Sequence, residues 1–230
     1  MLKVELHTHT ADDPVDYIAH TAQELIFRAR TLRYDAIAIT LHNKQLDVGP
    51  LMDYAKQQGV LLIPGVERSI HGKHVLLLNF SPRAERLNSF EELATLRQDE
   101  PAGVVIAPHP FFPAPSCLRG LMETHVALFD AVEVNAMYSR RVNFNRAAED
   151  WARRHDKPMV GNGDVHRLEQ LGTTYTLVDS ERTPNAICAA IRQGRTRVES
   201  TPLALVRAVW VMAKILPSGV LGALQRSRTS

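Results

Sequence analysis

Short apolar runs that alternate with helical patterns are the feature that most limits how this chain can fold. Residues 35–40 (DAIAIT) and 103–107 (GVVIA) are continuously apolar, as strands are when both faces are buried. Residues 15–32 instead place apolar side chains at helical spacing. We expect strands at residues 2–6, 35–40, 60–64, 75–80, 103–107, 131–134, 157–160, 175–178 and 196–199, and helices at 15–32, 48–58, 90–98, 144–155 and 185–192.

This order of elements predicts an α/β fold, with parallel strands covered by helices. With about seven strands in the main series, a closed or nearly closed barrel is favoured over an open sheet. A chain of 230 residues is long enough to bury such a core. Residues 1–200 would form the barrel, and residues 201–230 a separate apolar tail.

Composition excludes some classes of protein. The net charge of +2 does not indicate the dense basic face of a nucleic-acid-binding protein, so nucleic acid beyond nucleotides or short oligonucleotides is not expected as a partner. Cys117 and Cys188 lie far apart, without the spacing of a metal or redox motif, and suit free thiols in a reducing compartment. The first strand begins without a basic and apolar leader, so a cytoplasmic location is expected.

Polar side chains follow the expected strands at their carboxyl ends. His7 and His9 stand two residues apart after the first strand, so both imidazoles can point to one face. Alone, this pair would fit a strand end with two exposed histidines equally well. However, the other strand ends carry polar groups too, and active sites of β/α barrels are built on that rim. These groups are His42, Glu67, His109, Asn135, Asp164 and His166.

In order along the chain, these residues resemble the motifs of the PHP family, named for polymerase and histidinol phosphatase. The motifs are His7-x-His9 with a following acid, Thr40-Leu41-His42, Gly65-Val66-Glu67, His74 before an apolar strand, Ala107-Pro108-His109 and Asp164-Val165-His166. The resemblance implies a distorted (β/α)7 barrel that holds two or three divalent metal ions, such as manganese, zinc or iron. Leu41 departs from the pattern, because the family usually has aspartate there.

The resemblance also implies roles for individual residues. Glu67 would bridge two cations, and Glu67, Asp164 and His166 would serve catalysis. Metal-activated water attacking a phosphate is the expected chemistry. The expected metal ligands are His7, His9, Asp13, His42, Glu67, His74, His109, Asn135, Asp164 and His166.

Two ligand assignments remain open. Asp12 and Asp13 both follow the first histidine pair, with a slight preference for Asp13. Asn135 is either a ligand or a hydrogen-bonding residue at a strand end. Glu133 shares its strand face, so it could replace Asn135 or support a ligand.

A phosphate also needs cationic partners. Arg140, Arg141 and Arg167 follow strand ends and are candidates for phosphate binding, although each fits an exposed surface charge as well. The apolar loop at residues 111–115 is either a wall for a ring of the substrate or local packing over the barrel mouth.

The expected function is a metal-dependent phosphoesterase acting on a small phosphorylated metabolite or nucleotide. The alternatives are a metal-dependent hydrolase of a C–N or ester bond, and a non-catalytic metal-binding module. Residues 203–224 are apolar but interrupted, and predict a helix that packs on the barrel or on a partner. A peripheral membrane helix flanked by Arg226 and Arg228 is the alternative for this tail.

Overall fold

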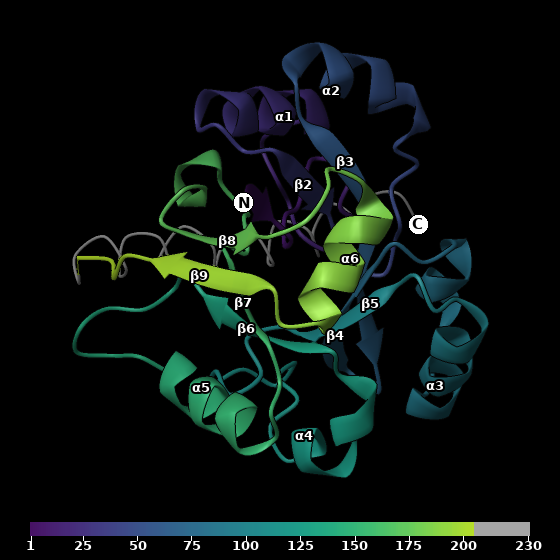
Figure 1. The fold of residues 1–230 in the computed structure, drawn as a ribbon, viewed down its shortest axis with the longest axis vertical. Coiled ribbons are helices and arrows are strands. Elements are labelled where there is room, and N and C mark those ends of the chain that lie inside the picture. Colours follow the sequence, from purple (N-terminus) through teal and green to yellow (C-terminus); the bar gives the residue numbers. More distant parts are fainter. Residues whose placement is uncertain (205–230) are drawn as a thin grey trace.

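The computed structural model describes residues 1–204, whose nine strands form a single sheet in the order β7-β6-β5-β4-β3-β2-β1-β8-β9. Helices surround this sheet (Figure 1). The strands are β1 (Leu2–Glu5), β2 (Ala36–Ile39), β3 (Leu61–Ile70), β4 (Lys73–Leu78), β5 (Val104–Ala107), β6 (Ala131–Asn135), β7 (Met159–Asn162), β8 (Thr174–Val178) and β9 (Thr196–Ser200). The α-helices are α1 (Ala22–Thr31), α2 (Met52–Gln58), α3 (Phe90–Asp99), α4 (Leu121–Thr124), α5 (Asn145–Arg154) and α6 (Pro184–Arg192).

Every strand expected from the sequence is present, but the sheet is mixed. Strands β1, β2 and β3 are parallel, as are β5, β6 and β7. Between the two groups, β4 runs antiparallel to both β3 and β5. The strand expected at residues 60–64 continues to Ile70 and turns back as a hairpin with β4. As a result, the first residues of β4, not its last, lie at the rim where the parallel strands end.

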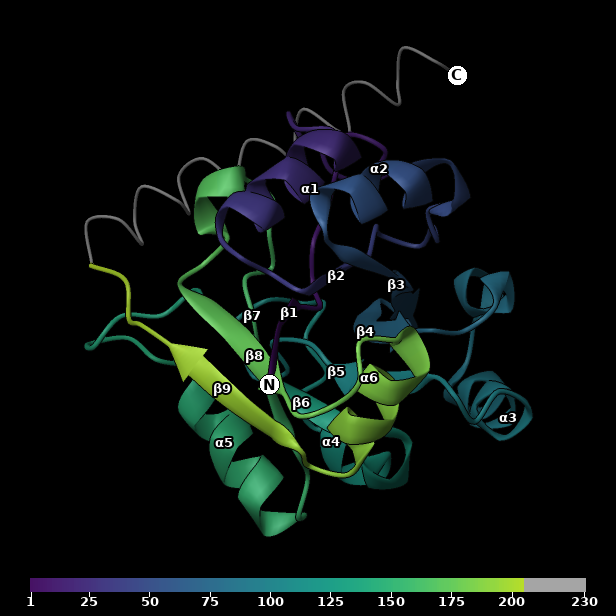
Figure 2. The same cartoon turned by 45° about the horizontal axis from the view of Figure 1, so that its top comes forward.

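The sheet curves until its two edges meet, which gives a nearly closed barrel. Strands β7 and β9 lie side by side in two views (Figure 2). A side-chain hydrogen bond joins the edges, since Thr196 of β9 donates to the Met159 carbonyl of β7 at 3.0 Å. The N–H of Gly161 in β7 also donates to the hydroxyl of Thr176 in β8, the neighbour of β9, at 2.9 Å. Gly161 is required there, because an added Cβ would lie 2.9 Å from the Tyr175 carbonyl oxygen and 2.8 Å from Val198.

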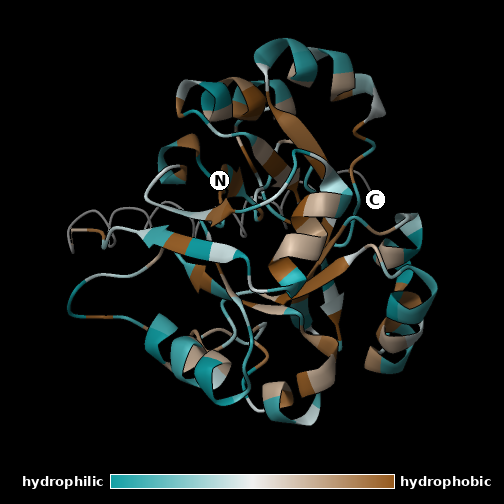
Figure 3. Ribbon diagram, in the orientation of Figure 1, coloured by the Kyte–Doolittle hydropathy of each residue, from teal (hydrophilic) through white to brown (hydrophobic). Residues whose placement is uncertain are grey.

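Apolar side chains form three groups. Much of the sheet is accordingly brown in the hydropathy view, although β9 is mostly hydrophilic (Figure 3). One group fills the barrel and includes Ile187 and Ile191 of α6, which closes one end of it. The second lies between the sheet and α1 and α2, and the third between the sheet and α3 and α5. With α6 filling one end, the opposite end of the barrel is left for polar side chains.

The helix expected at residues 15–32 begins later than predicted. Helix α1 begins after Thr21, whose side chain and that of Glu24 form a capping box. Residues 13–20 form a loop instead, in which the Asp13 carboxylate accepts hydrogen bonds from the Val15 and Asp16 amides. Such aspartate turns compete with helix formation, which explains the error.

Among residues 1–204, no helix combines the length and apolar character that crossing a bilayer requires. The helix expected at residues 203–224, with its alternatives, falls almost entirely on residues 205–230, which lie outside the described part of the chain. The division into a barrel and a tail stays a prediction.

Closure of the barrel at Gly161 can be tested. Gly161→Ala should lower the free energy of unfolding by about 1–3 kcal/mol, because the new methyl group overpacks the seam between β7 and β9. Gly120→Ala is the matched control, since a Cβ there meets nothing within 4 Å. Urea denaturation of both variants measures the difference, and equal stabilities would contradict this description of the seam.

Candidate metal centre

The rim at the carboxyl ends of the parallel strands gathers most of the histidines singled out in the sequence. His7 and His9 follow β1, where backbone hydrogen bonds to Val165 tie this segment to the one after β7. Glu67 lies within β3 and pairs with His42 in an isolated bridge. The remaining groups come from β4 and from the ends of β5, β6 and β7, namely His74, His109, Asn135, Asp164 and His166.

Four of these side chains converge on one point. The Nε2 atom of His7 lies 3.4 Å from Glu67 Oε2 and 3.4 Å from Asp164 Oδ1. The Nε2 atom of His9 lies 3.5 and 3.6 Å from the same two oxygens. In a tetrahedral site with metal–ligand bonds of about 2.0–2.2 Å, ligand atoms lie about 3.3–3.6 Å apart. The atoms of His7, His9 and Glu67 therefore have the spacing of ligands of one divalent cation, and Asp164 lies in a second such group with His7 and His109.

These nitrogens are also without other partners. His7 Nε2 and His9 Nε2 are buried and have no hydrogen-bond partner, although a buried polar group is normally paired. A cation between them and the two carboxylates would satisfy both. The residues present thus fit a metal ion by burial and by donor chemistry as well as by spacing.

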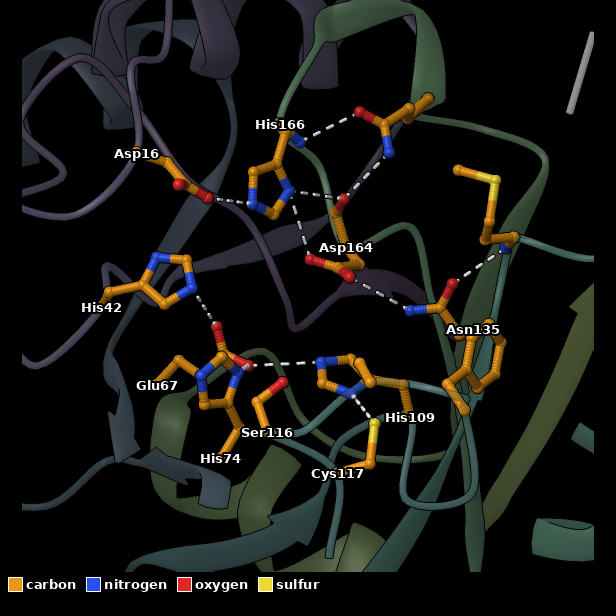
Figure 4. Close-up of a pocket in the computed structure, with 14 residues that line it drawn as sticks. Asp16, His42, Glu67, His74, His109, Ser116, Cys117, Asn135, Asp164 and His166 are labelled. Carbon is orange, nitrogen blue, oxygen red and sulfur yellow. Dashed lines mark hydrogen bonds and ion pairs between the residues drawn. The ribbon is translucent and has the colours of Figure 1, made fainter. Parts of the chain in front are cut away.

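Further ligand groups share Glu67 with the first. Its Oε1 atom lies 2.7 Å from His74 Nδ1 and 3.3 Å from His109 Nε2, and its Oε2 atom lies 3.1 Å from His42 Nε2 (Figure 4). Nitrogens of His9, His42 and His166 form another group within 4.8 Å of one another. Glu67 therefore stands where a bridging carboxylate is needed.

Carboxylates behind the imidazoles fix their orientation. Glu133 Oε2 lies 2.8 Å from His7 Nδ1. One oxygen of Asp13, Oδ2, lies 2.9 Å from His9 Nδ1 and 3.0 Å from His42 Nδ1, and it also accepts the His42 backbone N–H. With Nδ1 protonated in this way, Nε2 of each ring is left to face the cluster, which is how ligating histidines are commonly held.

The aspartate left open in the sequence is thereby located. Asp13 is completely buried at the cluster, whereas Asp12 is exposed and accepts a hydrogen bond from Thr10. Asp13 lies behind the imidazoles rather than among the grouped ligand atoms.

Asn135 and Glu133 take supporting positions. The Asn135 amide donates to Glu133 Oε1 at 2.9 Å, and its carbonyl oxygen accepts the Met137 N–H at 2.8 Å. In this geometry Asn135 is a hydrogen-bonding residue at a strand end, which was the alternative to a ligand role. Glu133 supports His7, as one of its two expected roles required.

The charges of the cluster shift its protonation. Burial would raise the pKa of Glu67, but the imidazoles of His74, His7 and His42 hold that pKa well below its usual range. Burial would likewise lower the pKa of His166, but the carboxylates of Asp164 and Asp16 raise it to about 10. Without metal, protons on His7, His109 and His166 thus help to balance the carboxylates.

Comparisons with known proteins agree with this architecture. A family model described as PHP-associated matches residues 142–196. PsfC from Pseudomonas syringae has a TM-score of 0.60 at 18% identity, over 100% of this chain and 99% of that one. A two-domain protein from Bacteroides vulgatus, which contains a predicted PHP-like metal-dependent phosphoesterase, gives 0.60 at 17% identity, over 86% of this chain and 64% of its own. The lesion-specific endonuclease PfuEndoQ from Pyrococcus furiosus gives 0.59 at 15% identity, over 92% and 66%. No curated protein sequence matches the chain.

The chain has the PHP fold. The distorted barrel that the resemblance implied is therefore confirmed, and the family model supports the resemblance over residues 142–196. The chain spans only 64% of the length of the B. vulgatus protein but nearly all of PsfC.

The cluster has a carboxylate beside His42 even though Leu41 stands where the motif usually has aspartate. Leu41 is fully buried in the apolar group between the sheet and α1 and α2. The carboxylate beside His42 comes from Asp13 instead.

The three arginines expected to bind phosphate do not reach the cluster. Arg140 and Arg141 line a separate depression formed with residues 201–204, and the Arg167 guanidinium lies 3.7 Å from Glu169. None of the three lines the cavity of about 270 Å³ beside the cluster. Loops carry these arginines, and the sequence pattern does not encode the course of a loop.

Three buried or partly buried groups near the cluster were missed. Asp16 Oδ2 lies 3.1 Å from His166 Nε2. Asp16 was not singled out because it fell within the helix expected at residues 15–32. Cys117 Sγ lies 3.5 Å from His109 Nδ1. Glu5 accepts the N–H groups of His7 and Gly163, and burial raises its pKa to about 8. Only Glu5 carried a signal, as a lone acid in an apolar strand.

The role of Asp13 can be separated from that of its neighbour. Asp13→Asn should weaken Zn²⁺ or Mn²⁺ binding about 10- to 100-fold, because the amide turns its NH₂ group toward N–H donors of His9 and His42. Asp12→Asn, one residue away and exposed, should bind as the wild type does. Competition with a chromogenic chelator measures both, and equal affinities would show that Asp13 does not support the cluster.

Metal binding should depend on pH in a defined direction. The pKa values of His7, His109 and His166 are raised, so these rings hold protons near pH 7 that a cation must displace. Affinity for Zn²⁺ should therefore rise from about pH 6 to about pH 8, with protons released on binding. Calorimetry in buffers of different ionisation enthalpy counts these protons, and binding without proton release would contradict the assignment.

Proposed function

We propose that this chain is a metal-dependent phosphoesterase acting on a small phosphorylated metabolite or nucleotide. The single observation that carries the proposal is the convergence of His7 and His9 with Glu67 and Asp164, at separations of 3.4–3.6 Å. The proposed metal ligands are His7, His9, His42, Glu67, His74, His109, Asp164 and His166, with Asp16 beside His166. We propose residues 1–200 as the catalytic unit.

Divalent cations in such a cluster supply acidified water and offset charge on phosphate oxygens. The chain's residues would do the rest. Glu67 offers both carboxylate oxygens to different ligand groups, so it fixes their separation. Asp13 and Glu133 hold the histidine rings in one orientation, so that little reorganisation is needed on binding.

His166 and Asp16 are the groups best placed to hold a proton. They lie 3.1 Å apart at the edge of the cavity, and both line it. The pKa of His166 is raised to about 10 in the metal-free protein, chiefly by Asp164 against the effect of burial. With a cation bound to His166, Asp16 is left as the group of this pair that can exchange a proton with a reacting oxygen nearby.

The cavity supports a small substrate. Its volume of about 270 Å³ lies near the lower end for ligand pockets. Similarity to an endonuclease is a similarity of fold, and the net charge of +2 does not favour a polymer of phosphates.

Hydrolysis of a C–N or ester bond is the second candidate. The observation that favours it is the cavity lining, which among the described residues contains neither lysine nor arginine. A screen that turns over amides or lactones, but releases phosphate from no ester, would select it.

Removal of one charge tests the phosphoesterase. Glu67→Gln keeps the side-chain shape but removes the shared carboxylate, and it should lower kcat/KM by about two orders of magnitude or more. Glu181→Gln, an exposed acid before α6, is the matched control. Phosphate release from a panel of phosphomonoesters is measured with Mn²⁺, with chelator and after metal content is determined. Activity that persists in chelator or in Glu67→Gln would refute the proposal.

A further inference from the structure

The cavity beside the cluster has an apolar wall. Phe112, Ala114 and Met137 line it, together with the histidines and acids of the cluster (Figure 4). The centroid of the Phe112 ring lies 6.3 Å from that of His109, at an interplanar angle of 66°. An aromatic ring thus lies beside a proposed ligand, in an edge-to-face arrangement.

The two phenylalanines of this loop divide between two tasks. Phe111 packs against the apolar group under α3 and α5, whereas Phe112 is half-buried and lines the cavity. Phe111 therefore takes the packing role considered for residues 111–115, and Phe112 lies where the alternative role, a wall for a substrate ring, needs a side chain. Phe112 is supported from outside by Phe144, whose ring centroid lies 5.4 Å away and which is 39% exposed.

Lysine and arginine side chains are absent from the cavity lining as far as residues 1–204 extend. The nearby candidates are engaged elsewhere, since Lys73 donates to the Pro115 carbonyl and Arg68 donates to Leu87 and Asn43. Arg140 and Arg141 line a different depression. The ligand cluster can receive one phosphate, but a second phosphate on the same molecule would find no cationic partner.

We propose that the site selects a phosphomonoester with a single phosphate and a flat aromatic ring, for which Phe112 is the stacking platform. The proposal rests on the phosphoesterase function argued above. Phe144 packs against the ring of Phe112, and Met137 lines the same cavity. Stacking accepts any planar ring, so a nucleobase and a simple aryl group share the chemistry.

Matched pairs of esters isolate the ring. Adenosine 5′-monophosphate and ribose 5-phosphate both release a primary alcohol, and they differ at the base. 2-Phenylethyl phosphate and ethyl phosphate form the second pair, with a simple aryl ring. In the metal-loaded full chain, kcat/KM should be about tenfold higher for the ring-bearing member, mostly through KM. Preference in the first pair alone identifies a nucleobase, and preference in both identifies any planar ring.

Variants then assign the preference to Phe112. Phe112→Ala should bring the ratio within a pair to about 1, and Phe112→Tyr should restore it, because the flat face returns. Phe27→Ala removes an exposed ring of α1 and should leave the ratio unchanged. Fructose 1,6-bisphosphate should show a higher KM than fructose 6-phosphate.

The results of these assays test the Phe112 platform separately from the phosphoesterase function. Equal kcat/KM values within both pairs, or a preference that Phe112→Ala does not change, would overturn the platform. A lower KM for the bisphosphate would overturn the restriction to one phosphate. Phosphate release from none of these esters would refute the proposed function itself, and this result differs from activity that ignores the ring.

Discussion

The burial of opposite charges at one end of the barrel is the constraint on which the structure depends. Glu67 is 1% exposed, and His7 and His9 are fully buried. Transfer of an unpaired carboxylate into such a site costs several kcal/mol, so each acid must face a proton or a cation. His7 provides either, since its raised pKa gives it a proton without metal and its ring offers a lone pair with metal. The same side chains can thus keep the metal-free barrel folded and leave it ready to bind cations.

The fold accepts backbone strain to place these side chains. His109 and Asp164, both at the cluster, have positive φ angles of 29° and 48°. Residues other than glycine rarely adopt this conformation, and each instance costs about 1–3 kcal/mol. At the other end of the barrel, α6 is packed through Ile187 and Ile191 among apolar side chains. The apolar end of the barrel therefore stabilises the fold, and the strained polar end carries the side chains of the cluster.

Strand ends could be predicted from the sequence because periodicity and parallel pairing are local rules. His7, Glu67 and His109 were found by assuming that parallel strands end on one rim. His74 reaches that rim for a different reason, because β4 runs antiparallel and begins there. Glu133 and Asp16 meet their histidines across 126 and 150 residues, which no local pattern encodes. The sequence did not predict the positions of Arg140 and Arg141 for a related reason, because loops rather than strands set those positions.

The Leu41 position shows how a motif can lack its aspartate while the cluster still contains a carboxylate beside His42. Leu41 and His42 are neighbours in an extended segment, so their side chains point to opposite faces. His42 faces the cluster, and Leu41 lies fully buried among the apolar residues beneath α1 and α2. A carboxylate in the place of Leu41 would be buried there without a cation. Asp13 instead approaches from the loop after β1 and reaches the backbone N–H and the Nδ1 atom of His42 with one oxygen. Because the same oxygen also holds His9, this single aspartate ties together two of the ligand groups that meet at the rim.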